Sequence, residues 1–160
     1  MKSIRVGQGL DIHPFDASKK CVLGGVTIPG NPGLKGHSDA DALTHAICDA
    51  LLGAMCEGDL GQHFADTDPA HKNQSSLYFL KQVMQLVQDQ NWTISNIDST
   101  VLTEAPMLKT HIPEMKKVLC PLLEISESQF SIKATRPEKL GALGRKEGLM
   151  ALATVLIFQP

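Results

Sequence analysis

The hydrophobic positions of the chain recur with two different periods, which separate extended segments from helical ones. Short runs of β-forming residues occupy positions 4–7 and 21–23. Gly24 and Gly25 follow the second run, and the stretch 29–33 is rich in Pro and Gly, so both stretches favour turns. The N-terminal part of the chain is therefore predicted to form a β-hairpin.

Three segments show the 3.6-residue spacing of amphipathic helices. They span residues 38–52, 75–88 and 107–119. Ser38 or Asp39 is expected to cap the first of these helices, because a side-chain oxygen can accept a hydrogen bond from the free amides at a helix start. The pattern thus predicts three helices after the hairpin.

Three further strands are expected at positions 94–102, 130–134 and 149–158. The last is apolar and β-branched, which is typical of a buried central strand. Strands separated by helices predict an α+β fold, a two-layer sandwich in which a mixed β-sheet carries helices on one face after the N-terminal hairpin. The strand order stays open. The length and the absence of a linker predict one domain over residues 1–160.

Charge and cysteine content narrow the classes of partner. The chain has 15 basic and 17 acidic residues, so its net charge of −2 gives no positive field for nucleic acid or an anionic membrane. A phosphate-bearing ligand would have to be held by local groups. Its four cysteines form no Cys-x-x-Cys pair, so we expect buried thiols and no thiolate zinc site. No signal peptide or membrane span is expected, which favours the cytoplasm, or a plastid after removal of a transit peptide.

Asp11 and His13 form the first candidate for chemistry. They lie two positions apart just after a predicted strand, so their side chains point to the same face and can converge on one cation. The alternative is an ordinary Asp–His pair on a solvent-exposed face.

The second candidate lies on the helix that begins near Ser38. Asp41, His45 and Asp49 stand at i, i+4 and i+8 and share one face. Two histidines and one aspartate, with a fourth position open, would form a catalytic rather than a structural zinc site. Two alternatives remain: solvated aspartates beside a hydrogen-bonded histidine, or Asp41 and Asp49 orienting the imidazole.

Two loops complete the candidates. Residues 58–61 and 64–68 combine glycines with three aspartates, a pattern that suits a ligand but also an ordinary turn. Residues 133–141 and 144–148 are basic and punctuated by glycine, which indicates a local anion site or a charged exposed loop.

Read together, these residues resemble the 2-C-methyl-D-erythritol 2,4-cyclodiphosphate synthase family, from about Arg5 to Leu156. The matching stretches are 7–13, 24–29, 36–41, 45–54, 58–64, 66–68, 105–106, 133–135, 138–141 and 144–148. In this family the 2-phosphate of a cytidine-diphosphate-linked methylerythritol attacks the β-phosphorus and CMP leaves, on the non-mevalonate route to isoprenoid precursors.

The resemblance assigns roles to single residues. It implies that Asp11, His13 and His45 hold one zinc ion per subunit, and that Glu138 holds magnesium or manganese with the substrate diphosphate. It implies catalytic roles for His37, Arg136 and Asp59. The implied substrate-binding residues are Asp11, His13, His37, Ser38, Asp59, Leu60, Gly61, Phe64, Ala65, Asp66, Thr67, Asp68, Thr103, Glu104, Ala105, Pro106, Met107, Leu108, Lys109, Thr135, Arg136, Pro137, Glu138, Ala142 and Arg145.

The resemblance also implies a homotrimer with each active site between two subunits, and it places Gly9, Ala142 and Arg145 along the three-fold axis. Three positions depart from the usual pattern. Arg136 replaces a threonine, Met107 replaces a lysine, and Ala142 replaces an aromatic residue.

Two other classes of function share the same residue types. A metal-dependent phosphohydrolase would use these aspartates and histidines to activate water and would release inorganic phosphate. A non-catalytic zinc-binding trimeric protein would need a closed site of four ligands, which this set does not supply.

Overall fold

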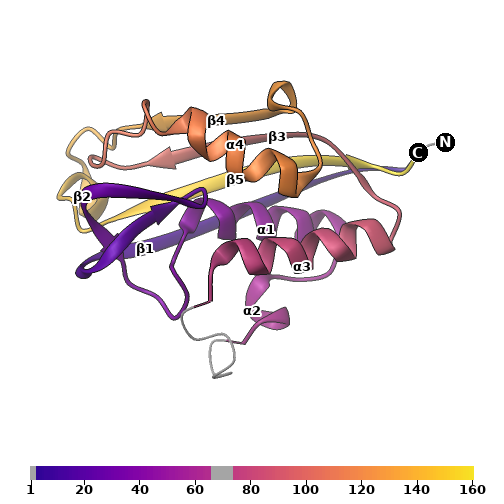
Figure 1. The fold of residues 1–160 in the computed structure, drawn as a ribbon, viewed down its shortest axis with the longest axis horizontal. Helices are drawn as coiled ribbons and strands as arrows, with labels where there is room; N and C mark the ends of the chain where they lie inside the picture. The colour runs from indigo at the N-terminus through magenta and orange to yellow at the C-terminus, as the bar shows by residue number, and fades with distance from the viewer. Residues whose placement is uncertain (1–2, 66–73) are drawn as a thin grey trace.

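The computed structural model describes residues 3–65 and 74–160 (Figure 1). Its elements in chain order are β1 (Ile4–Leu23), β2 (Val26–Leu34), α1 (Ala42–Met55), α2 (Leu60–His63), α3 (Ser76–Asp89), β3 (Thr93–Leu102), α4 (Ile112–Leu123), the 3₁₀ turn η2 (Glu127–Gln129), β4 (Phe130–Thr135), α5 (Gly141–Gly144) and β5 (Gly148–Phe158).

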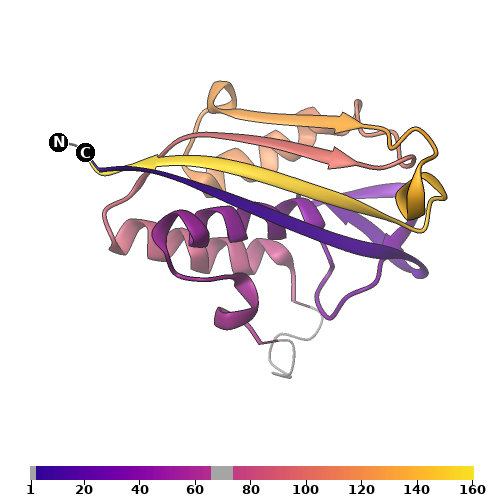
Figure 2. The ribbon, with the colours of Figure 1, turned by 180° about the vertical axis from the view of Figure 1, so that it is seen from behind.

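The strands form one five-stranded sheet in the order β2-β1-β5-β3-β4. The β3–β4 pair is parallel and the other pairs are antiparallel, so the sheet is mixed as expected. The apolar strand β5 lies at its centre, which confirms the prediction for that segment. Helices α1, α3 and α4 cover one face (Figure 1), and the two termini lie side by side at one end of the sheet (Figure 2). The α+β class is thereby confirmed.

The N-terminal hairpin is present, but its arms are longer than the two short runs predicted. β1 is one strand of 20 residues, which pairs first with β5 and then with β2. Gly24 and Gly25 make the turn with φ of +58° and +72°. The stretch 29–33, expected as a turn, lies inside β2, where prolines are tolerated because β2 is an edge strand.

Two helix starts differ from the prediction while α3 matches it to within a residue. α1 begins at Ala42 behind Asp41 instead of at Ser38. α4 begins at Ile112 instead of Met107 and runs on to Leu123. Pro lies in its first turn, where the fixed φ of proline suits a helix start.

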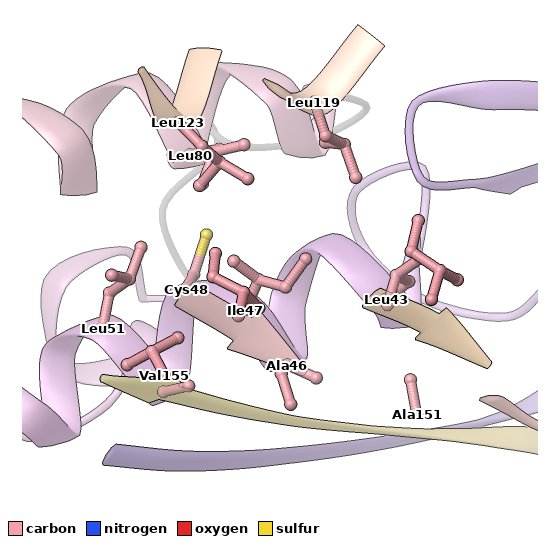
Figure 3. Close-up of a cluster of buried hydrophobic side chains, with 14 of the residues drawn as sticks. Leu43, Ala46, Ile47, Cys48, Leu51, Leu80, Leu119, Leu123, Ala151 and Val155 are labelled. Atoms are coloured by element: carbon pink, nitrogen blue, oxygen red, sulfur yellow. The ribbon is translucent and has the colours of Figure 1, made fainter. Parts of the chain in front are cut away.

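The contact between α1 and β1 is unusually close because β1 carries glycine where the helix lies. A Cβ atom on Gly9 would lie 2.0 Å from the carbonyl oxygen of Ala46, and one on Gly7 would lie 2.0 Å from that of Ala50. Gly9 therefore faces the helix and not the open face of the sheet. Its expected place along a three-fold axis stays a prediction. The helix buries its apolar side chains against β5 and towards α3 and α4; Figure 3 labels Leu43, Ala46, Ile47, Cys48, Leu51, Leu80, Leu119, Leu123, Ala151 and Val155.

On the opposite face of the sheet, the part formed by β1 and β5 is open and mostly apolar, with the polar pair Gln8 and Thr154 in its middle. The apolar β1 side chains of this part are 52–67% exposed, and the register places an apolar residue of β5 across from each of them. The four pairs are Ile4 with Phe158, Val6 with Leu156, Leu10 with Leu152 and Ile12 with Met150. We call these eight residues the open apolar face.

Three of the four cysteines are buried, as predicted, and Cys56 is exposed because it ends α1 in a left-handed conformation. Among the described residues, no helix has both the length and the apolar character needed to cross a membrane.

Asp41 joins the start of α1 to the hairpin turn. Its carboxylate is fully buried and accepts hydrogen bonds from the amides of Gly24, Gly25 and Thr44 at 2.8, 2.7 and 3.1 Å. The Thr44 hydroxyl donates a fourth bond at 2.7 Å. One side chain thus fixes where the helix begins relative to the sheet.

The variant Asp41→Ala should lower the free energy of unfolding by about 3 kcal/mol or more, because it leaves several buried donors without an acceptor. Asp41→Asn keeps one carbonyl oxygen and should lose distinctly less. Urea unfolding at a fixed protein concentration measures both. Equal, small losses in the two variants would contradict this account of the cap.

Candidate active site

Asp11, His13 and His45 meet where α1 begins above β1. Asp11 and His13 continue the alternation of Gly7 and Gly9, so they point to the face that the helix covers. The Asp11 oxygen Oδ2 lies 2.9 Å from Nε2 of His13 and 3.1 Å from Nδ1 of His45. One ligand atom from each side chain falls within 4.8 Å of the others, a spacing suited to one metal ion. The structure thus brings together the three side chains that the sequence analysis proposed as metal ligands.

The ring of His13 is fixed by a backbone carbonyl. Its Nδ1 lies 2.8 Å from the oxygen of Lys35, which can only accept, so Nδ1 carries a proton and donates it. In the neutral ring, Nε2 then has no proton, and its lone pair points towards Asp11. A metal ligand needs this tautomer, because the metal binds the unprotonated nitrogen.

Asp11 supplies the negative charge of the cluster. Burial raises its pKa, but when the His13 and His45 rings carry a proton on the nitrogen that faces Asp11, their hydrogen bonds and positive charge outweigh burial and hold the pKa of this carboxyl well below its usual range. Asp11 is therefore ionised at neutral pH, as an oxygen ligand must be.

The cluster lines a cleft of about 250 Å³. Its lining residues are Asp11, His13, Gly36, His37, Ser38, His45, Asp49, Leu60, Gly61, Phe64 and Phe79. Asp49 accepts a hydrogen bond from the Leu60 amide at 2.8 Å, which joins α1 to the start of α2. Burial raises the pKa of Asp49, the Leu60 amide lowers it in part, and the nearby Asp59 and Asp11 raise it further.

The predicted face of Asp41, His45 and Asp49 is correct for the last two only. Asp41 turns to the hairpin as the helix cap and does not orient the imidazole. The reason is that α1 begins at Ala42, which makes Asp41 the cap and not a residue of the helical face.

The expected polyol pocket is only partly assembled in the described residues. His37, Ser38, Leu60, Gly61 and Phe64 line the cleft as expected. Asp59 instead caps α2, accepting from the Gln62 amide at 3.0 Å, and is exposed beside the cleft. Ala65 is exposed. Asp66, Thr67 and Asp68 lie outside the described residues.

A second group of predicted residues gathers elsewhere, on the loops that follow the parallel strands β3 and β4. The Thr103 amide donates to the Thr135 carbonyl at 3.1 Å, and the Lys139 amide donates to Glu104 at 2.6 Å. Figure 2 shows both arrowheads ending at the same side of the molecule. The group comprises Thr103, Glu104, Ala105, Pro106, Met107, Leu108, Lys109, Thr135, Arg136, Pro137 and Glu138.

Within the described part of one chain, this loop group does not line the metal cleft. Glu138 is exposed, stands at a φ of +52°, and is not part of the three-residue cluster. Ala142 and Arg145 are also exposed, and the Arg145 guanidinium donates to Glu147 at 2.7 Å. The structure thus divides the predicted site into two separate groups.

Three residues near the cluster were missed from the sequence. Phe79 of α3 lies 6.4 Å from His45 between ring centroids and helps to line the cleft. Ser76 and Asp39 form hydrogen bonds behind the His45 ring. The sequence does not indicate that Ser76 contacts a histidine, because His45 lies 31 positions away in the chain.

The geometry fits an open metal site beside a polar cleft. Two imidazoles and one carboxylate leave a fourth tetrahedral position for a ligand, which is the arrangement of catalytic sites. Glycine and hydroxyl groups border that position, so an oxygen-rich ligand can approach.

Comparison with known proteins decides between the classes that share such a site. The model of the YgbB family matches residues 4–158. The chain belongs to the YgbB family. A relative from Nostoc punctiforme, named 2-C-methyl-D-erythritol 2,4-cyclodiphosphate synthase, is 49% identical over 159 residues, which cover 99% of either chain. A relative of the same name from Francisella philomiragia is 47% identical over 156 residues, which cover 97% of our chain and 98% of the relative.

Solved structures show the same fold. The bifunctional IspDF of Campylobacter jejuni superposes with a TM-score of 0.95 at 38% identity, over all of this chain and 43% of that longer one. The IspF of Plasmodium falciparum, in a complex with CDP, gives a TM-score of 0.86 at 34% identity and covers 98% and 97% of the two chains.

Removing both imidazoles tests the metal cluster. The double variant His13→Ala, His45→Ala should lose bound metal after dialysis, because one carboxylate cannot hold a divalent cation tightly. His63→Ala is the matched control, since His63 lies outside the cluster and contacts the Glu57 carbonyl. Elemental analysis measures metal per chain. Full metal content in the double variant would contradict the assignment.

Proposed function

We propose that this chain converts 4-diphosphocytidyl-2-C-methyl-D-erythritol 2-phosphate into 2-C-methyl-D-erythritol 2,4-cyclodiphosphate and releases CMP. The observation that carries the proposal is the Asp11, His13 and His45 cluster in a chain that matches named synthases over nearly its whole length. In the reaction an oxygen of the 2-phosphate bonds to the β-phosphorus, and the bond from that phosphorus to the oxygen of CMP breaks. The enzyme is a phosphorus–oxygen lyase.

The reaction needs positioning and neutralisation of charge more than a protein nucleophile. Asp11, His13 and His45 would hold one zinc ion per subunit. When bound, zinc supplies Lewis-acid polarisation of a phosphate oxygen. The Lys35 carbonyl supports this assignment, since it accepts the Nδ1 proton of His13 and so leaves the lone pair of the neutral ring on Nε2.

His37 and Ser38 would contact the phosphates and the polyol from the rim of the cleft. Both line it, and the exposed His37 ring can turn towards developing negative charge. Leu60, Gly61 and Phe64 would form the wall of the polyol pocket, and the exposed Asp59 beside the cleft would bind the hydroxyls of the polyol.

The loop group after β3 and β4 would form the cytidine half of the site. Backbone amides and carbonyls of residues 103–109 would recognise the base, and Thr135 and Arg136 would contact the leaving phosphate. Glu138 would hold magnesium or manganese, a hard ion that prefers oxygen ligands such as a carboxylate and a diphosphate. Arg136 would bring a positive charge where the usual family pattern implies a threonine hydroxyl.

We also propose a homotrimer in which the two halves of the site come from neighbouring subunits. Two observations support it. The cleft and the loop group are separate in one chain. The open apolar face also exposes Ile4 and Val6 by 65% and 67%, and exposed apolar patches mark contacts between proteins. Three copies of this face, packed around one axis, would bury it.

The proposed compartment is the cytoplasm, or a plastid after removal of a transit peptide. Four free cysteines, three of them buried, support a reducing environment.

Product analysis tests the activity directly. Incubation with the cytidylylated substrate and magnesium should give the phosphorus NMR signals of a cyclic diphosphate together with CMP. Release of inorganic phosphate would favour the phosphohydrolase instead, and an unchanged substrate would favour the non-catalytic zinc protein. Either result would contradict the synthase.

Subunit mixing tests the shared site. Homogeneous His45→Ala and Glu138→Gln proteins should each lose activity, because the first lacks the zinc half and the second the magnesium ligand. Co-assembled subunits should recover part of it, since some interfaces then pair an intact zinc half with an intact Glu138. Mixed oligomers without activity, or a monomer in sedimentation of the unaltered protein at micromolar concentration, would contradict the proposal.

A further inference from the structure

The His45 ring is held from behind by two further side chains. Its Nε2 lies 2.8 Å from Oγ of Ser76, the fully buried first residue of α3. Ser76 in turn makes two bonds to Asp39: its hydroxyl donates to Oδ1, and its amide donates to Oδ2 at 3.0 Å. Oγ of Ser38 lies farther from the same ring nitrogen, at 3.4 Å.

The direction of these bonds fixes the proton on the ring. A serine hydroxyl has one hydrogen, and the carboxylate of Asp39 takes it, so the Ser76 oxygen presents a lone pair to His45. Nε2 of His45 must then carry the hydrogen of that bond. In the neutral ring this leaves Nδ1 as the lone pair, and Nδ1 is the nitrogen beside Asp11.

We propose that Ser76, oriented by Asp39, is a positioning residue that holds His45 in the tautomer and orientation needed for metal binding. The inference rests on the zinc site of the proposed function. His13 and His45 use opposite nitrogens, and each is fixed by a protein acceptor on its far side: the Lys35 carbonyl and the Ser76 hydroxyl. Such partners behind metal-ligating histidines raise metal affinity.

The same bonds could serve only to brace two helix starts. Asp39 also accepts from the Asp41 amide at 3.2 Å, and its own amide donates to the Gln74 carbonyl at 3.2 Å. The cap of α3 is, however, the neighbouring Ser75, whose hydroxyl accepts from the Leu77 amide at 3.3 Å. Ser75 and Ser76 therefore separate the two roles, one capping the helix and the other contacting His45.

Zinc affinity of the two serine variants decides between these roles. The full-length protein is stripped of metal and titrated with Zn²⁺ in competition with a coloured chelator. Ser76→Ala should bind zinc about 10- to 100-fold more weakly than the unaltered protein. Ser75→Ala, which costs helix stability without touching His45, should stay within about twofold. Equal affinities in the two variants would overturn the inference.

Nitrogen-15 NMR of labelled histidine reports the tautomer of His45 directly. This tautomer would not change if Ser76 only stabilised the start of α3. In the metal-free unaltered protein, His45 should show a protonated Nε2 and an unprotonated Nδ1. Ser76→Ala should give signals averaged between the two tautomers, while Ser76→Thr keeps the hydroxyl and should restore both the tautomer and the affinity. An unchanged His45 spectrum in Ser76→Ala would overturn the inference.

Asp39→Asn provides a second route should Ser76→Ala fail to fold. An amide group facing Ser76 can donate, which turns the serine hydroxyl towards His45 and moves the ring proton to Nδ1. We expect at least a tenfold loss of zinc affinity, and unchanged affinity would overturn the inference. If the unaltered protein bound no zinc, the proposed metal site itself would fail. If it bound zinc and formed product while Ser76→Ala matched Ser75→Ala, only this inference would fail.

Discussion

The close contact between α1 and β1 is the constraint on which the rest of the site depends. Alternate residues of β1 face the helix, and two of them, Gly7 and Gly9, have no side chain to keep it away. The next two in the same alternation are Asp11 and His13. The two-residue alternation of β1 that lets the helix approach thus also directs the Asp11 and His13 side chains towards the first turn of α1, where they meet His45. A shift of one residue would destroy the packing and the cluster together.

The alternation of side chains along β1 also gives its two faces different roles. Gly7 and Gly9 form the helix contact and Asp11 and His13 join the candidate metal cluster, whereas the intervening apolar residues of β1 belong to the open apolar face. An exposed apolar patch on a sheet face marks a site where another protein surface binds. The separation of the loop group from the cleft points the same way, because a neighbouring copy can cover the face and complete the site in one step.

Periodicity in the sequence was sufficient for the elements whose partners are close in the chain. It predicted α3 and β3 to within a residue, the central position of β5, and the shared face of Asp11 and His13. It failed where a distant partner decides. Asp41 became a cap because the hairpin turn offers it two amides 16 and 17 positions away. Residues 29–33 lie within a strand because Pro32 and Gly33 pair with Lys20 and Asp16 of β1. Ser76 contacts a histidine on another helix.

The central claim is that the seating of α1 on β1 creates a metal site between Asp11, His13 and His45. Anomalous diffraction at the zinc absorption edge, from crystals of the purified full-length protein, tests it most directly. The account predicts one peak per chain within bonding distance of Oδ2 of Asp11, Nε2 of His13 and Nδ1 of His45. A zinc peak elsewhere in the chain, with none among these three atoms, would contradict it.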